Sequence, residues 1–193
     1  MTIGQKDRAE NMFMESIKIE PSAGAYSNLG YVYWHQNNYL KAMEMYENAI
    51  AEWETVLDYI LLGNLADTYR FVSGDREKAE EKYRLAIQLA EGHLGSNPRD
   101  AETSGWLGRF YARINDREKA LQRISDAKRM APNNQTVLRL CVYVHEFIDQ
   151  RDQALQALQE LIERGGSLEE FQKDPDLADL RRDPRYKQLT GGN

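Results

Sequence analysis

Small and apolar residues recur along the chain at a spacing that predicts paired helices. Residues at i, i+4 and i+7 lie on one face of a helix, and alanines on that face let a neighbouring helix approach closely. The spacing occurs in four sets: Ala42, Tyr46 and Ala49; Ala79, Tyr83 and Ala86; Ala120, Ile124 and Ala127; Ala154, Leu158 and Leu161. Each set predicts a helix whose apolar face packs against a partner.

A second signal precedes each of these predicted helices. The dipeptide Leu29-Gly30 recurs as Leu62-Gly63 and Leu107-Gly108, and Cys141-Val142 takes the matching place, at intervals of 33, 45 and 34 residues. Turn and N-cap residues separate the two signals in every case. These are Asn37-Asn38, Gly74-Asp75, Asn115-Asp116 and Asp149-Gln150. The unit is therefore helix, tight turn, helix, and Pro21, Pro98 and Pro132 mark where second helices end.

These repeats resemble the tetratricopeptide-repeat (TPR) family, whose unit is a helix pair of about 34 residues. The third unit matches the family pattern best, with Trp106-Leu107-Gly108, Tyr111, Ala120, Ala127 and Pro132. The resemblance implies an all-α fold, a right-handed α-solenoid of helix-turn-helix repeats with short C-terminal capping helices.

We expect a single TPR domain over residues 1–193. Its predicted parts are an N-terminal half repeat or cap helix (5–20), repeat 1 (23–55), an extended repeat 2 (56–100), repeat 3 (101–134), repeat 4 (135–164) and a C-terminal cap (168–190). Repeat 2 is longer by about one helical turn in its first helix and two in its second. At the N-terminus, Ala9, Phe13 and Ser16 repeat the second-helix spacing without a first helix, so the chain is either a fragment or begins with a cap.

The C-terminal sequence breaks the helical pattern at Gly165-Gly166-Ser167. Asp174-Pro175 and Asp183-Pro184 then each offer an N-cap followed by proline at the first helical position. Leu177, Leu180 and Tyr186 are predicted to cover the last repeat, because terminal repeats need a polar outer cap. This ending resembles those of C-terminal TPR regions in bacterial multidomain signalling proteins.

Composition narrows the function class. The formal net charge of −6 argues against broad nucleic-acid binding, and no apolar run is long enough for a signal peptide or a membrane span. We therefore expect a cytoplasmic protein without a membrane segment. The only cysteine, Cys141, stands where other repeats have leucine, so a buried packing role is expected for it. No histidine has a metal-ligand spacing, and the sequence predicts no catalytic residues, no metal and no cofactor.

The resemblance also implies a binding groove. In TPR solenoids the residues one, four and five places after the glycine position point into the concave face; we call this side the first-helix face. From it we select as partner-binding candidates Tyr31, Trp34, His35, Asn64, Asp67, Arg109, Arg113, Tyr143 and Phe147. Aromatic residues and arginine dominate binding hot spots, although Trp34 and Phe147 fit a packing role equally well.

The leading hypothesis is a non-enzymatic scaffold that binds a protein or peptide, and the residues at the groove centre favour an acidic partner. Arg109 and Arg113 lie one helical turn apart and can take a carboxylate bidentately, unless Asp67 and Glu146 neutralise them. The alternative is a self-assembly module that forms homo-oligomers through repeat 2, around residues 87–97, or through the N-terminal end.

Overall fold

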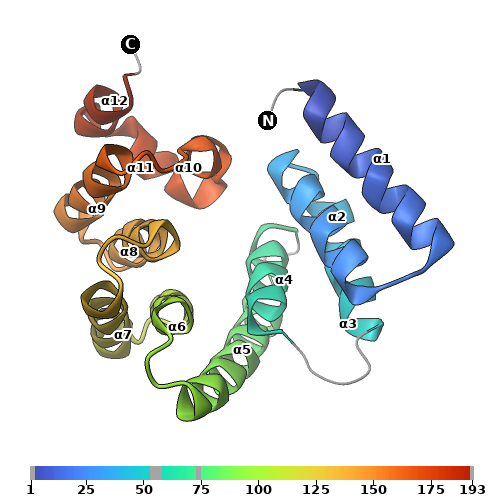
Figure 1. Ribbon diagram of the computed structural model, residues 1–193, viewed down its shortest axis with the longest axis horizontal. Coiled ribbons are helices and arrows are strands. Elements are labelled where there is room, and N and C mark those ends of the chain that lie inside the picture. The colour runs from blue at the N-terminus through green and yellow to red at the C-terminus, as the bar shows by residue number, and fades with distance from the viewer. Residues whose placement is uncertain (1–2, 53–57, 73–74, 192–193) are drawn as a thin grey trace. The chain divides into compact units, whose positions relative to one another are not determined.

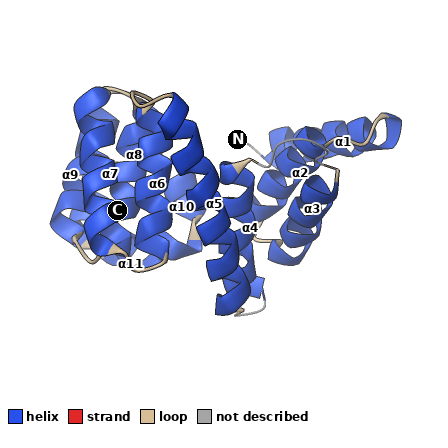
Figure 2. Ribbon diagram, turned by 90° about the horizontal axis from the view of Figure 1, so that it is seen from below, coloured by secondary structure: helices blue, strands red, loops and turns tan. Residues whose placement is uncertain are grey.

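The computed structural model describes residues 3–52, 58–72 and 75–191, and within these ranges the chain is helical without a strand (Figures 1 and 2). The helices are α1 (Ile3–Ile19), α2 (Ala23–His35), α3 (Tyr39–Ala51), α4 (Tyr59–Val72), α5 (Arg76–Ser96), α6 (Ala101–Arg113), α7 (Arg117–Met130), α8 (Gln135–Phe147), α9 (Arg151–Glu163), α10 (Glu169–Lys173), the 3₁₀ helix η1 (Pro175–Leu177), α11 (Ala178–Arg182) and α12 (Pro184–Thr190). The predicted all-α fold with short C-terminal helices is confirmed.

Two compact units make up the chain. Unit 1 covers Met1–Leu89 and unit 2 covers Ala90–Asn193, so the boundary between them falls within α5. Unit 1 contains the pair α2 and α3, with α1 against α2, and unit 2 contains the pairs α6 with α7 and α8 with α9. The expectation of one domain over residues 1–193 stays a prediction.

Asparagine and aspartate shape the turns within the helix pairs. Asn37, Asn115 and Asp149 adopt positive φ angles of 59°, 64° and 59°. Residues with short polar side chains tolerate this left-handed conformation better than most others. The following residues Asn38 and Asp116 cap the second helices by accepting backbone N–H bonds. The predicted turn residue Gly74 lies outside the described residues.

The predicted packing faces form the core of both units. Every residue of the four i, i+4, i+7 sets is buried, with at most 2% of its surface exposed. Gly30 sits so close to the buried ring of Tyr46 that an added Cβ would lie 2.7 Å from its Cε1 atom. At Gly108 the same atom would lie 3.2 Å from the backbone oxygen of Ala120. The glycine therefore sets how closely the two helices of a pair approach.

The second helix pair is longer, as the sequence predicts. α5 has 21 residues, whereas α3 has 13 and α7 has 14. α4 continues past Gly63 to Val72, about one turn further than α2 continues past Gly30. In unit 2, the end of α5 is held against α6, where Glu91 accepts a 2.5 Å hydrogen bond from the Tyr111 hydroxyl and Ala90 is fully buried.

At the N-terminus, α1 packs less completely than a second helix of a repeat. Ala9 and Phe13 are half-buried, and Ser16 is exposed. Gln36 of unit 1 donates a 2.9 Å hydrogen bond to Glu10. Met12 and Ile19 remain largely exposed, so the spacing of α1 resembles that of a second helix without producing the same burial.

The C-terminal helices begin where the Asp-Pro pairs predict. Asp174 accepts a hydrogen bond from the backbone N–H of Asp176, and Asp183 accepts one from that of Arg185, both at 2.9 Å. Proline follows each cap, where its missing N–H costs no helical hydrogen bond. Leu177, Leu180 and Tyr186 are buried, and α12 packs against α9. Predicted cap residues thus cover the last repeat.

We predict that Gly30→Ala destabilises the chain by about 1–3 kcal/mol, because the new methyl group would overlap the buried Tyr46 ring. Gly24→Ala on the same helix is the matched control, since its added Cβ would meet no atom within 4 Å outside its chain neighbours and the backbone of its own helix. That control should change stability by less than about 1 kcal/mol. Urea denaturation followed by circular dichroism measures both, and equal midpoints for the two variants would contradict the close-approach account.

Candidate functional site

In unit 1, the predicted first-helix face is partly open. Tyr31 is 45% exposed, and its ring meets the His35 ring edge-on at 4.3 Å between centroids. Trp34 instead packs between helices, with its centroid 4.9 Å from that of Tyr39 and 5.4 Å from that of Phe71. Tyr31 is therefore exposed, while His35 and Trp34 are both half-buried, Trp34 within an aromatic cluster.

The two predicted positions on α4 differ from each other. Asn64 is half-buried, and its backbone carbonyl accepts a 2.7 Å hydrogen bond from the Thr68 hydroxyl. Asp67 is only 3% exposed and accepts a short hydrogen bond from the Tyr83 hydroxyl of α5. Asp67 therefore joins two helices of the core of unit 1.

In unit 2, the predicted residues of the first-helix face are covered. Arg109 is 6% exposed, and its guanidinium lies 5.3 Å from the Trp106 ring centroid and 5.2 Å from that of Tyr143. Arg113 lies 3.6 Å over the Phe147 ring. Cations stacked on aromatic faces in this way gain about 0.5–2 kcal/mol, more when they are desolvated. The structure thus brings Arg109, Arg113, Tyr143 and Phe147 together.

The covering group is the chain's own C-terminal segment, by which we mean α10, η1 and α11, residues 169–182. Asp176 forms an ion pair with Arg113, and the two side chains are 9% and 5% exposed. The Tyr143 hydroxyl lies 2.9 Å from carboxylate oxygens of both Glu170 and Asp174. Burial, together with these two carboxylates, raises the pKa of Tyr143 well above its ordinary value. The hydroxyl therefore stays a donor toward the segment at neutral pH.

An apolar anchor accompanies these polar contacts. Phe171 is fully buried, and its ring centroid lies 5.5 Å from that of Tyr143. Arg181 folds the segment on itself by donating to the backbone carbonyls of Phe171 at 2.8 Å and Asp174 at 2.5 Å. Figure 1 shows α10 and α11 beside α8 and α9.

Sequence reasoning expected these arginines to meet a carboxylate, but it named other sources for it. Glu146 forms its ion pair with Arg151. The carboxylate that reaches Arg113 in unit 2 comes from Asp176, far away in sequence. Phe171 and Asp176 were not predicted as site residues. They lie in α10 and η1, and they reach Tyr143 of α8 and Arg113 of α6 only because of the path that the chain takes after Gly166.

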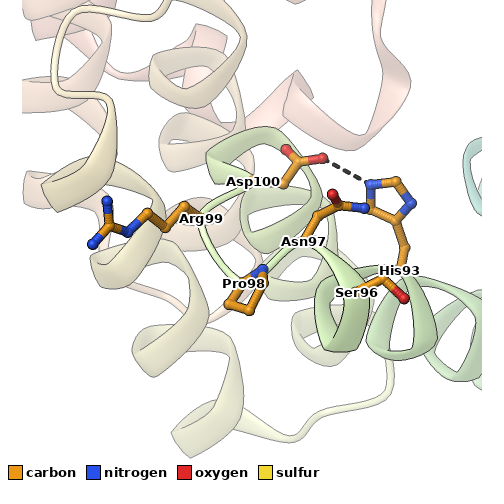
Figure 3. A pocket seen from close by; sticks show the side chains of 6 residues that line it. All are labelled: His93, Ser96, Asn97, Pro98, Arg99 and Asp100. Carbon is orange, nitrogen blue, oxygen red and sulfur yellow. Dashed lines mark hydrogen bonds and ion pairs between the residues drawn. The ribbon is translucent and has the colours of Figure 1, made fainter.

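A depression lies where α5 ends and α6 begins, lined by His93, Ser96, Asn97, Pro98, Arg99 and Asp100 (Figure 3). His93 Nε2 lies 3.0 Å from Asp100 Oδ2, and the Ser96 hydroxyl points away from the imidazole. Burial raises the pKa of Asp100, but hydrogen bonds from Thr103 and His93 outweigh it and lower the pKa below its usual value. Asp100 serves here as the N-cap of α6, with Thr103 N–H donating at 3.1 Å. This local structure explains the pair without catalysis.

Other chemistry is sparse in the part of the chain that the structure describes. No three His, Cys, Asp or Glu side chains there are grouped so as to hold a metal ion. None of the described helices is both long and apolar enough to cross a membrane. Cys141 is buried, and burial raises the pKa of its thiol to about 12. A thiol with that pKa is a poor nucleophile at neutral pH.

Comparisons with known proteins agree with this architecture. The sequence profile of the tetratricopeptide repeat matches residues 21–92. The structure of TTC0263, a thermophilic TPR protein of Thermus thermophilus, is similar with a TM-score of 0.60 at 20% identity, covering 97% of this chain and 92% of that one. The Pseudomonas aeruginosa pilF structure is similar with a TM-score of 0.53 at 17% identity, covering 97% and 90%. No curated protein matches the sequence.

At these identities the structural likeness shows the fold alone. It shows an all-α solenoid fold of the tetratricopeptide-repeat type, and the repeat profile matches part of the chain, residues 21–92. Proteins of this fold are typically non-catalytic scaffolds, and the absence of enzymatic activity stays a prediction.

We predict that Asp176→Asn lowers the free energy of unfolding by about 1–3 kcal/mol, because it removes the negative charge that pairs with the buried Arg113 guanidinium. Asp179→Asn is the control on the same segment, since its pair with Arg182 is 74–79% exposed. That change should stay within about 0.5 kcal/mol. Urea denaturation measures the free energy of unfolding of both variants. Equal decreases for the two variants would show that the buried ion pair stabilises the chain no more than the exposed one does.

The thiol gives a separate prediction. With its pKa raised to about 12, Cys141 should react with a disulfide reagent at pH 8 on the order of a thousandfold more slowly in the folded chain than in urea. Absorbance of the released thiolate follows the reaction. Fast labelling of the folded chain would mean that Cys141 is exposed and activated, contrary to its packing role.

Proposed function

We propose that this chain is a protein-interaction scaffold that binds a protein or peptide on its first-helix face. One observation carries the proposal: the first-helix face of unit 2 holds a segment of polypeptide through an aromatic anchor and carboxylate contacts. Stacked repeats bury a core only with their neighbours and so present an extended surface. A face that accommodates one segment of chain is suited to accommodate another.

The open part of this face is in unit 1. Tyr31 provides an exposed aromatic ring beside half-buried His35, and half-buried Asn64 adds an amide on α4. Tyrosine offers a large contact area with little loss of conformational freedom, and aromatic residues are enriched in binding hot spots. We propose these residues as the contact surface for the partner in unit 1, with Trp34, which packs against Tyr39 and Phe71, as a further candidate.

The setting we propose is a regulatory module of a bacterial signalling protein in the cytoplasm. The support is the C-terminal sequence, in which Asp174-Pro175 and Asp183-Pro184 frame short capping helices like those that end TPR regions of such proteins. The net charge of −6 supports a protein partner over a nucleic acid. The genes next to the coding sequence, or a kinase, cyclase or DNA-binding domain in the same reading frame, test this setting.

The alternative of self-assembly through residues 87–97 has less support. Ile87 and Ala90 are buried within the chain, and the exposed positions that follow are polar or glycine: Glu91, Gly92, His93, Gly95, Ser96 and Asn97. Obligate homodimer interfaces are rich in apolar area. This stretch offers little of it.

Selection of a displayed peptide library on the full chain tests the proposed surface in unit 1. Peptides recovered there should lose at least about tenfold in affinity with Tyr31→Ala, because a contact-centre aromatic contributes about 1 kcal/mol or more. Leu40→Ala is the control, since Leu40 is exposed on the second helix α3. Titration calorimetry gives both affinities. Binding that depends on Leu40 and not on Tyr31 would place recognition on the opposite helices.

A further inference from the structure

We propose that the C-terminal segment is an exchangeable internal ligand of α6 and α8, and that this face binds an external peptide of the same chemistry. That chemistry is an aromatic residue followed, three and five residues later, by carboxylates, as in Phe171, Asp174 and Asp176. The segment then controls access, because a partner must displace it. The proposal rests on the scaffold function and specifies both the class of partner and its regulation.

The segment makes contacts typical of recognition in addition to the packing of its buried Leu177 and Leu180. Its anchor Phe171 is fully buried beside Tyr143, while the carboxylates of Glu170 and Asp174 approach the hydroxyl of that same tyrosine. Asp176 meets Arg113 in a desolvated ion pair. An aromatic anchor flanked by charge-assisted contacts at the centre of a covered surface is the arrangement of a binding hot spot.

The receiving face makes a carboxylate obligatory. Arg113 lies on Phe147, and Arg109 lies between Trp106 and Tyr143, so both cations are held by aromatic rings away from water. Removing one partner of a buried ion pair is strongly destabilising, so a purely apolar occupant would be rejected. The planar guanidinium of arginine is suited to a carboxylate rather than to a neutral group. The partner is therefore acidic, as the sequence led us to expect.

The segment is joined to the repeats in a way that permits exchange. α10, η1 and α11 contain five, three and five residues, too short to be stable as isolated helices. Before them, Gly165 has a φ of 69° and is exposed, as is Ser167, whereas Gly166 lies against Leu161 and donates a 2.9 Å hydrogen bond to its backbone carbonyl. The cores of the pairs α6–α7 and α8–α9 consist of other residues, among them Leu107, Ile124 and Leu158. Undocking the segment does not remove these cores.

Tethering determines how strongly a partner must bind. A ligand joined to its receptor by a short stretch of chain acts at an effective concentration of about the millimolar range or above. An external peptide with the same contacts therefore competes poorly with the intact chain and well with a chain whose own segment is weakened. This difference distinguishes an exchangeable ligand from a fixed part of the core.

The test uses a fluorescein-labelled peptide with the sequence of Leu168–Arg182 and full-length variants. Phe171→Ala with Asp176→Asn weakens the internal segment and leaves the receiving face intact. We expect this double variant to bind the peptide at least about tenfold more tightly than the unaltered chain does, measured by fluorescence anisotropy. A peptide carrying the same two substitutions should bind at least about tenfold more weakly.

Two further variants locate the binding. Adding Arg113→Met to the double variant should reduce peptide affinity at least about tenfold, whereas adding Arg129→Met, an exposed arginine of α7, should not. Absence of binding at about 1 mM peptide by a double variant with unchanged helicity would overturn the proposal. Equal binding to the double variant and the unaltered chain would also overturn it, because the peptide would then bind elsewhere.

Hydrogen exchange on the unaltered chain decides the question if the double variant does not fold. Amides of residues 169–182 should exchange through a local opening at least about tenfold more frequent than that of α8. If the amides of the segment and of α8 exchange with the same opening free energy, the two unfold together, and the proposal would be overturned. The scaffold function is tested separately at Tyr31. Partner binding that depends on Tyr31, without exchange of the C-terminal segment, would support the scaffold function and contradict the proposal of an exchangeable segment.

Discussion

The close approach of the two helices in the pairs α2–α3 and α6–α7 is the constraint on which much of the rest of the structure depends. Gly30 lies against the ring of Tyr46, and Gly108 lies against the backbone of α7. Because the approach leaves no room for a side chain at the glycine, the alanines of the second helix become fully buried. The opposite side of each first helix is then turned away from its partner. The first-helix face lies only partly on that side, because Tyr31 is 45% exposed whereas Trp34 contacts Tyr39 of α3 and Asp67 contacts Tyr83 of α5.

In unit 2 this available side is occupied by the chain itself. The C-terminal segment contributes Phe171 to the aromatic surface and Asp176 to Arg113, so a cap that shields the last repeats also satisfies a buried cation. Shielding and recognition thus use the same contacts. In unit 1 the corresponding residues Tyr31 and His35 meet each other and leave Tyr31 substantially exposed.

Much of the fold could be predicted from the sequence because the repeat is encoded locally. The spacing of alanines, the turn residues Asn37 and Asn115, and the Asp-Pro caps each act within a few residues, and the structure places each as expected. The site was less predictable, because burial at Asp67 and Arg109 depends on contacts with α5 and α8. The pairing of Arg113 with Asp176 depends on a chain reversal after Gly166 that no local pattern specifies.

The central claim is that polypeptide partners bind the side of the first helices that faces away from the second helices. Amide chemical-shift mapping by nuclear magnetic resonance, during titration with a selected peptide, tests this most directly because it reports every backbone position at once. The account predicts that the largest shifts fall on α2 and α4, or on α6, α8 and the C-terminal segment, according to the unit that is used. Shifts concentrated on α3, α7 and α9, with the first helices unchanged, would contradict it.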